Sequence, residues 1–464
     1  MTTAHAPGLE AWLEQQLRCS AQSMLACISP VAIVKHRPGF GQTVRPVPGA
    51  IVASTVLGDW KPDPDYFFHW FRDSAVVIDA LRLLYVERRV GGVALQHLRD
   101  FTRFSLALND LDGRAICAVP DRRAGVQAEF LQYLREDSEL ERLHGDAVAA
   151  DVRVNADGTL DISRWSRPQH DGPPLRALAL LRWVNEVRLD APLLDELAEL
   201  IRFDLAFTLR HWREPSYDIW EEESGHHYYT LRMSAQALAE GATWLQALGD
   251  AEGARRCREA SRAALRLLDG YWNEDALGGY YRARRLADGR PSAKDLDIAV
   301  ILAAIHAHGP GLDDAQAHGV ADPRMHATLA RLDALFASAY PINSAVNREA
   351  ARSGRGTAMG RYAGDVYFSG GAYYFSTLGA AEFCFRAAQC SGDARDRRDW
   401  FERGDAYLAT VRAYTPASGE LSEQFDQRSG EQTSARQLAW SHAALISCAS
   451  ARRAAAAFEG SRPR

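Results

Sequence analysis

Apolar residues recur at helical spacing along almost the whole chain, and this periodicity most constrains what it can fold into. Within each stripe an apolar side chain returns every three or four residues, the pattern of a helix with one buried face. Strand-like alternation is short and local. About a dozen helices are expected, which predicts an all-α fold rather than alternating helices and strands. The clearest stripes are Ala75–Leu84, Leu98–Leu108, Leu175–Val187, Leu193–Leu209, Leu231–Leu248, Ala254–Leu268, Ile298–His306, Met325–Phe336, Ala380–Ala388 and Leu438–Ala451.

The composition is that of one large globular domain. The chain has 464 residues, of which 47% are hydrophobic, so a sizeable core is easily buried. No linker rich in Ser, Thr or Pro divides it, and we expect a single domain over residues 1–464. The net charge is −6 with acids and bases interspersed, which gives nucleic-acid binding no electrostatic support.

The N-terminal segment Met1–Ile28 lacks the basic patch and apolar centre of a secretory signal. The longest apolar runs are far too short to span a bilayer. The seven cysteines are scattered and lack CxxC spacing, which indicates buried thiols in a reducing compartment. His226 and His227 are adjacent, so their side chains point apart and do not form a metal site. We expect a cytoplasmic monomer that binds neither membrane nor nucleic acid and needs no metal or cofactor.

The loops are more informative than the helices, because several of them concentrate polar and aromatic residues directly before a helix. If the helices run parallel in one ring, these loops gather at one end and form the mouth of a site. A Ser429-x-x-Gln432 spacing also predicts a capping box at the start of the last helix. The loops are Asp65–Asp73, Tyr217–Tyr229, Gly360–Gly371 and Gly419–Gly430.

One of these loops contains Trp220-Glu221-Glu222-Glu223, an indole beside adjacent carboxyls. A sugar-cleaving site needs an aromatic face for the pyranose ring and a carboxyl whose pKa neighbouring groups can raise. Glycosidic hydrolysis also needs a second carboxylate to activate water or attack the anomeric carbon, and Glu423 is the candidate for that role. From the residues alone, both glutamates could equally be ordinary surface side chains.

Other residues are compatible with a sugar site but also with a structural role. Arginine and aspartate can bind sugar hydroxyls, yet Arg72-Asp73 and the pair Arg361 and Asp365 could be plain salt bridges. Large aromatic residues stack on pyranose rings, yet they are more often part of the core. The aromatic candidates are Trp70, Trp165, Trp220 and Tyr373.

Taken together, the loop motifs resemble those of a known family. The segments Asp65–Ser74, Trp165–Arg176, Tyr217–Glu222 and Gly419–Asp426 with Gly430-Glu-Gln432 are similar to successive motifs of the glucoamylase family, glycoside hydrolase family fifteen. The resemblance extends from Ala50 to Leu445. Members of this family are inverting, exo-acting glucan hydrolases. The resemblance implies an (α/α)6 barrel of six outer and six inner helices with the site at one end.

The resemblance also implies roles for individual residues. Glu221 matches the general acid and Glu423 the general base, which should lie about 6.5–9.5 Å apart to leave room for water. Arg72, Asp73 and Arg361 match ligands of the glucose at subsite −1, and Asp365 matches the acid that belongs with Arg361. Tyr66 and Trp70 match the aromatic wall, Trp165 the indole near the acid, Glu222 a carboxylate at subsite +1 and Asp218 a supporting acid. The full set of expected substrate-binding residues is Tyr66, Trp70, Arg72, Asp73, Trp165, Asp218, Ile219, Trp220, Glu222, Arg361, Asp365 and Tyr373.

The expected function is that of a glucan 1,4-α-glucosidase, which releases β-D-glucose from non-reducing ends of soluble α-glucans or maltooligosaccharides in polysaccharide degradation. Departures from the starch-acting pattern leave alternatives open. The loop Tyr362-Ala-Gly-Asp365 stands where Tyr-Pro-Glu-Asp is common, Tyr373 where many members have tryptophan, and His69 and His442 replace threonine and tyrosine. An α-1,6-specific isomalto-oligosaccharide or dextran glucosidase, a trehalase and a non-catalytic carbohydrate-sensing domain are the alternatives. No starch-binding module is expected.

Overall fold

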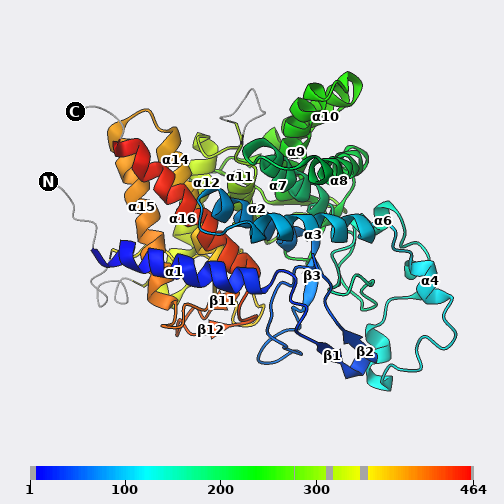
Figure 1. Ribbon diagram of the computed structural model, residues 1–464. Helices are drawn as coiled ribbons and strands as arrows, with labels where there is room; N and C mark the ends of the chain where they lie inside the picture. Colours follow the sequence, from blue (N-terminus) through cyan, green and yellow to red (C-terminus); the bar gives the residue numbers. More distant parts are fainter. Residues whose placement is uncertain (1–6, 276, 310–316, 345–353, 461–464) are drawn as a thin grey trace. The chain divides into compact units, whose positions relative to one another are not determined.

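Helices dominate the computed structural model, which describes residues 7–275, 277–309, 317–344 and 354–460 (Figure 1). The chain divides into two compact units. The Glu221 unit consists of Leu25–His226 and Ser234–Arg262, and the Glu423 unit consists of Met1–Met24, His227–Met233 and Ala263–Arg464. Three helices have residues in both units: α1 (Pro7–Ala26), α9 (Tyr228–Ala247) and α10 (Ala251–Asp269).

In the Glu221 unit, α2 packs against α7, and α7 and α3 both pack against α8. Gly172 at the start of α7 allows a close approach to α2, because a Cβ there would lie 2.7 Å from the Cβ of Phe71. The first turns of α2 and α7 are therefore neighbours. The helices are α2 (Phe71–Val86), α3 (Val93–Leu108), α4 (Gly113–Cys117), α5 (Asp137–Leu140), α6 (Asp146–Ala149), α7 (Gly172–Glu186) and α8 (Ala191–His211), with 3-10 turns η1 (Pro38–Phe40) and η2 (Ala128–Tyr133).

In the Glu423 unit, α14 is buried along most of its length and packs against α11, α15 and α16, which lie around it (Figure 1). Gly379 of α14 fits against Leu302 of α11, where a Cβ would come within 2.6 Å of the leucine side chain. The helices are α11 (Ala299–His306), α12 (Pro323–Ala339), α14 (Tyr374–Cys390), α15 (Ala394–Tyr414) and α16 (Ala439–Gly460), with the 3-10 turn η3 (Pro341–Asn343).

The strands are short, and several of them lead directly into a helix. Trp70 of β3 precedes α2, His227 of β6 precedes α9, and Tyr373 of β10 precedes α14. The antiparallel pairs are β1 with β2, β3 with β4, β5 with β6, β7 with β8, and the three-stranded order β10-β11-β12. Their bounds are β1 (Lys35–Arg37), β2 (Gln42–Val44), β3 (Phe68–Trp70), β4 (Arg153–Asn155), β5 (Ser216–Tyr217), β6 (Ser224–His227), β7 (Trp272–Asn273), β8 (Tyr280–Tyr281), β9 (Arg284–Leu286), β10 (Ala372–Tyr373), β11 (Gln424–Phe425) and β12 (Gln432–Thr433).

The predicted helices are confirmed, and the polar loops do precede helices. The predicted capping box is wrong: α16 begins at Ala439, and Gln432 lies in β12, where its side-chain amide donates to the Glu420 carbonyl oxygen at 2.8 Å. Helix α15 was not predicted, because its apolar residues are interrupted by many charged ones.

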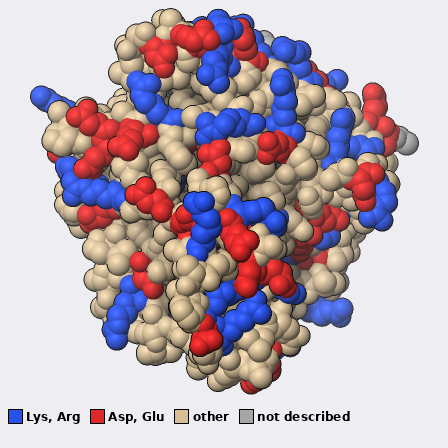
Figure 2. Space-filling model, turned by 90° about the vertical axis from the view of Figure 1, so that its right-hand side faces the viewer, with Lys and Arg blue, Asp and Glu red and all other residues tan. Residues whose placement is uncertain are grey.

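The charge distribution, the cysteines and the apolar character of the helices bear on the expectations from composition. Basic and acidic side chains are interspersed on the face shown in Figure 2. All seven cysteines are free. Within the described part of the chain, we find no helix with both the length and the apolar character needed to cross a bilayer.

Candidate active site

The β5–β6 hairpin presents Glu221 at its tip. Residues 218–223 connect the two strands, with Ser216 opposite Gly225 and Tyr217 opposite Ser224. The Asp218 carboxylate organises this loop by accepting hydrogen bonds from the backbone N–H groups of Glu222 at 2.8 Å and Glu223 at 2.9 Å. Glu221 itself has φ +64°, a left-handed conformation that is costly for a residue with a side chain. Asp218 therefore supports the loop.

Three N–H groups converge on the Glu221 carboxylate. Oε1 accepts from Trp70 Nε1 at 2.9 Å and from Arg72 Nη2 at 3.1 Å. Oε2 accepts a short hydrogen bond from Trp165 Nε1. Because all three groups donate, the arrangement suits the ionised form of Glu221, which is the form left after a general acid has given up its proton.

Arg72, in the first turn of α2, lies among several acids. Its guanidinium is 3.3 Å from Asp73, 3.5 Å from Asp171 and 3.1 Å from Glu221. Burial opposes the charge of Arg72, but these three carboxylates raise its pKa above the usual value. Arg72 Nη1 also donates to Gln169 Oε1 at 3.1 Å.

Asp73 is buried beside Arg72, yet its Oδ2 has no hydrogen-bond partner within the described part of the chain. Burial raises the pKa of Asp73 to about 6, although the Arg72 charge acts in the opposite direction and the Glu221 charge adds to the rise. A buried carboxyl oxygen that accepts no hydrogen bond is available to a ligand hydroxyl. This geometry is compatible with the predicted contact between Asp73 and substrate.

The sequence motifs contained Gln169 and Asp171, but no role was predicted for either. Gln169 joins two predicted residues, because its side chain accepts from Arg72 and its Nε2 donates to the Asp218 carbonyl oxygen at 2.7 Å. Gly172 allows this segment to approach the start of α2. Both residues lie within the Trp165–Arg176 motif, and this position is the sequence feature that could have identified them.

Two tryptophan rings near Glu221 contact the guanidinium of a buried arginine, Arg153. Trp70 pairs with Arg153 across the β3–β4 ladder, and the Tyr66 and Trp70 rings lie 5.2 Å apart. The Arg153 guanidinium lies 3.7 Å from the Trp165 ring and 4.9 Å from the Trp70 ring. Trp165 remains 41% exposed, so part of its indole is free for a ligand. Arg153 was not predicted, since nothing in the sequence links it to Trp165.

The remaining predicted residues of this unit differ in exposure. Glu222 is partly exposed, whereas Ile219 and Trp220 are buried at 2% and 9% exposure. Their contacts with substrate stay predictions.

In the Glu423 unit, Glu423 lies directly before β11. Its backbone N–H donates to the Ala435 carbonyl oxygen at 2.8 Å, and its carbonyl oxygen accepts from the Tyr374 N–H at 3.2 Å. The carboxylate is 8% exposed and accepts a short hydrogen bond from Ser434 Oγ. Ser434 has φ +63°, so this hydroxyl is also presented from a left-handed residue. Sequence reasoning missed Ser434.

Arg361 and Asp365 form an ion pair. Arg361 Nε and Nη2 donate to the two oxygens of Asp365 at 2.7 and 2.6 Å, a bidentate geometry. Tyr373 donates its hydroxyl hydrogen to Asp365 at 2.9 Å and accepts from Gln424 Nε2 at 2.8 Å. Tyr373 is fully buried, which raises its pKa well above the usual value. Gln424, which was not predicted, thus belongs to this network, and it directly follows Glu423 in the chain.

The two histidines that depart from the family pattern both lie in the interior of their units. His69 accepts from the Ile51 N–H at 3.0 Å, and His442 lies 3.0 Å from Ser20 Oγ and 3.2 Å from Gln437 Oε1. Burial lowers the pKa of each to about 3. Both are therefore neutral, and their hydrogen bonds are to protein groups.

Comparison with known proteins gives one family. The model of glycosyl hydrolases family 15 matches residues 39–108 and 149–450, which include every predicted site residue. The chain is 25% identical to the glucoamylase of Blastobotrys adeninivorans over 462 residues, covering 88% of this chain and 68% of the relative. It is 24% identical to an intracellular sporulation-specific glucoamylase of Saccharomyces cerevisiae, covering 94% and 82%.

Solved structures give the same answer for the fold. The glucoamylase of Hormoconis resinae superposes with a TM-score of 0.75 at 25% identity, covering 96% of this chain and 74% of that one. The Saccharomycopsis fibuligera glucoamylase gives a TM-score of 0.76 at 21% identity, covering 97% and 96%. The predictions of family, fold class and enzyme class are confirmed. The chain belongs to glycosyl hydrolases family 15, the glucoamylase family, and is an O-glycosyl hydrolase with an (α/α)6 barrel fold.

Proposed function

We propose that the enzyme is an inverting glucan 1,4-α-glucosidase, which removes β-D-glucose from the non-reducing ends of soluble α-glucans and maltooligosaccharides. The observation that carries the proposal is the Glu221 carboxylate, held by Arg72, Trp70 and Trp165 within segments that match family 15. The relatives described above are named glucoamylases, which favours the α-1,4 bond over the alternatives.

Glu221 is the proton donor in the proposed reaction. It protonates the glycosidic oxygen as the bond to the anomeric carbon breaks, and the departing sugar leaves with a free hydroxyl. The resulting carboxylate is stabilised by the three N–H donors around it. Glu222, adjacent in the hairpin tip, is assigned to the departing sugar.

Glu423 is the base. It accepts a proton from a water molecule as the water oxygen bonds to the anomeric carbon from the face opposite the leaving group, which inverts the configuration. The Ser434 hydroxyl orients the Glu423 carboxylate by donating to Oε2. Water supplies both the new hydroxyl and the proton that Glu423 accepts. Glu423 then releases this proton to solvent and Glu221 regains one, so atoms and charges balance over the cycle.

The other predicted residues are assigned to sugar binding. Arg72, Asp73 and Arg361 bind hydroxyls of the terminal glucose. Asp73 Oδ2 lies 3.3 Å from the Arg72 guanidinium but accepts no hydrogen bond in the described part of the chain, so it can accept one from a sugar hydroxyl. Tyr66, Trp70 and Trp165 supply aromatic surface. Asp218, Asp365 and Tyr373 act through their neighbours, since their polar atoms bind protein groups.

The enzyme is assigned to the cell interior as a monomer. The yeast relative is described as intracellular, and free thiols are typical of reducing compartments. Cell fractionation and light scattering of the purified chain test the two assignments.

The decisive assay measures glucose release from maltotriose, isomaltotriose and trehalose, and follows the first-formed anomer by NMR. The expected result is β-glucose from maltotriose at the highest kcat/KM. A preference for isomaltotriose or trehalose would replace the α-1,4 assignment with an alternative, and α-glucose as the first product would contradict inversion. Sugar binding without hydrolysis of any of the three would leave a carbohydrate-sensing domain.

A further inference from the structure

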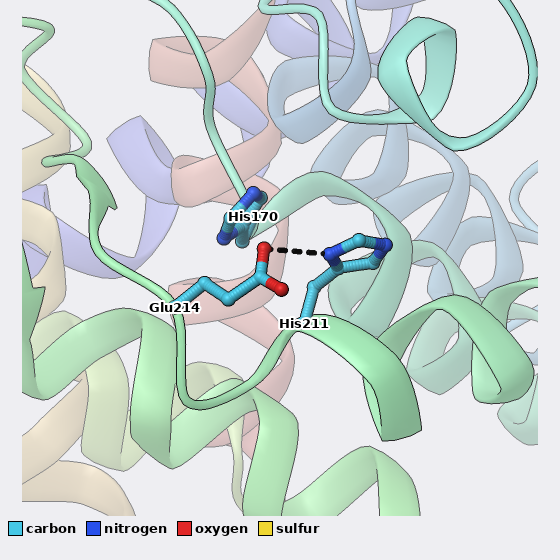
Figure 3. A group of neighbouring side chains, drawn as sticks. All are labelled: His170, His211 and Glu214. Atoms are coloured by element: carbon cyan, nitrogen blue, oxygen red, sulfur yellow. Dashed lines mark hydrogen bonds and ion pairs between the residues drawn. The ribbon is translucent and has the colours of Figure 1, made fainter.

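His170, His211 and Glu214 form a cluster that the proposed reaction does not use. One ligand atom from each lies within 4.8 Å of the others, and Figure 3 shows the Glu214 carboxylate between the two imidazole rings. His211 ends helix α8, Glu214 follows in the turn after it, and His170 lies just before α7. His211 Nδ1 and Glu214 Oε2 are 2.8 Å apart. All three residues belong to the Glu221 unit.

His170 is the member of the cluster with a buried ring nitrogen that makes no hydrogen bond in the described part of the chain. It is 5% exposed, and this nitrogen is Nδ1. A buried, unsatisfied polar atom costs about 1–3 kcal/mol. A metal ion bound to Nδ1 would satisfy this atom, since a neutral imidazole nitrogen is a metal ligand.

We propose that His170, His211 and Glu214 bind a divalent transition metal ion, Zn²⁺ being the best match. Two imidazoles and one carboxylate are an established zinc donor set, with water in the fourth position. Ligand atoms of a tetrahedral zinc site lie about 3.4 Å apart, given bonds of about 2.1 Å. The cluster must therefore contract when the ion binds, and Glu214 is its exposed member. The ion takes the place of the proton shared between His211 and Glu214.

The partner of the other His211 nitrogen strengthens the assignment. His211 Nε2 lies 2.8 Å from Asp146 Oδ2, and Arg210 holds that carboxylate with bonds of 2.6 and 2.8 Å. A carboxylate on the far nitrogen fixes the tautomer and orientation of a metal-binding histidine and makes it a stronger ligand. Asp146 comes from residues 109–148, the stretch that the family model does not match. The supporting carboxylate is thus supplied by a segment outside the family pattern.

The site lies next to residues of the candidate active site along the chain. His170 stands between Gln169 and Asp171, and both of these contact Arg72. An ion bound to His170 and to the end of α8 would hold this segment in place. Zinc is therefore expected to stabilise the folded enzyme, because it binds the native arrangement and not the unfolded chain.

The test is zinc titration of the full chain, without an affinity tag, after chelator treatment and dialysis. Calorimetry is expected to show one zinc ion per chain, and saturating zinc is expected to raise Tm. Glu214→Gln and His211→Gln should each weaken zinc binding more than about 10-fold, and Asp146→Asn about 10- to 100-fold. The matched control is His36→Gln, which removes an exposed histidine bonded to Thr43 and should bind zinc like the parent.

Glu214→Gln keeps the test valid if the substitution of buried His170 prevents folding, because Glu214 is exposed. Absence of stoichiometric binding to the parent chain would overturn the proposal. So would undiminished binding to both Glu214→Gln and His211→Gln, which would place the zinc at other groups. Binding is measured without substrate, so the outcome is independent of the proposed activity.

Discussion

The Glu221 and Glu423 units present their carboxylates in different electrical surroundings. Around Glu221, a single guanidinium, that of Arg72, lies within 3.5 Å of three carboxylates. In the Glu423 unit, Arg361 and Asp365 pair one to one in a bidentate bridge. Burial raises the pKa of Asp73 to about 6, and the Glu221 charge adds to the rise against the opposing charge of Arg72. The Glu221 carboxylate therefore shares its guanidinium partner with two other acids.

The two units share one backbone device but use it differently. Glu221 has φ +64°, so the proposed acid is itself the strained residue. In the other unit the left-handed residue is Ser434, at φ +63°, which donates to Glu423. Strain of this kind persists only where surrounding contacts fix it. Asp218 provides these contacts at the hairpin tip. In the other unit, Glu423 precedes β11 and Ser434 follows β12, and the pairing of Gln424 with Thr433 holds these two ends together.

The largest expected effect comes from replacing each carboxylate. Glu221→Gln and Glu423→Gln should each lower kcat on maltotriose by about 10²–10⁴-fold, because each removes a proton-transfer group. The two variants should differ with α-D-glucosyl fluoride, whose leaving group needs little protonation. Glu221→Gln should recover much of its rate on this substrate and Glu423→Gln should not. Equal recovery by both variants would contradict the assignment of acid and base, and unchanged ligand binding serves as the control for folding.

The pH dependence of the free energy of unfolding tests the raised pKa of Asp73 beside Arg72. The pKa of Asp73 is raised from 3.8 to about 6, so the folded protein binds the extra proton between these values. The free energy of unfolding therefore falls as pH rises through this window, by at most about 3 kcal/mol, and is constant above it. Asp73→Asn should remove this contribution. Urea unfolding of both proteins across the window measures it, and a constant difference between them would show that Asp73 titrates normally.

A smaller effect is expected from one of the two indole donors. Trp165→Phe keeps an aromatic ring over Arg153 but removes the N–H that donates to Glu221. Loss of a hydrogen bond to a charged group should lower kcat/KM by about 10- to 100-fold. Steady-state kinetics on maltotriose measures the loss. Tyr66→Phe, which keeps its ring near Trp70, is the control, and an equal loss there would indicate a general disturbance of the aromatic residues.

The smallest effect is expected at Ser434. Removing its hydroxyl takes away a hydrogen bond that favours the charged Glu423, so the acidic limb of the kcat profile should move to higher pH. Ser434→Gly isolates the hydroxyl, because glycine accepts a positive φ without strain. Ser434→Ala should show the same shift together with lower stability. A profile that stays in place in Ser434→Gly would exclude the hydroxyl from tuning the base.

Sequence periodicity predicted most helices, since a buried helix face requires apolar residues every three or four positions. It failed at α15, where Gly404 and Asp405 occupy buried positions and interrupt the apolar stripe, and charged residues cover the exposed faces. The capping box failed because Ser429 and Gln432 lie before and within strand β12, so the spacing that suits a helix start is used in a strand.

The sequence by itself determined the all-α class, the loops that precede helices and, through the family motifs, the two carboxylates. These properties are written in local patterns of a few residues. Only the tertiary structure decided which groups hold those carboxylates. Trp70 lies 151 positions from Glu221, and Arg153, Gln169 and Ser434 became visible only through contacts. The cluster of His170, His211 and Glu214 also depends on tertiary structure, because His170 reaches His211 only when α7 and α8 pack. Hydrogen bonds and ion pairs depend on distance in space, which sequence separation does not determine.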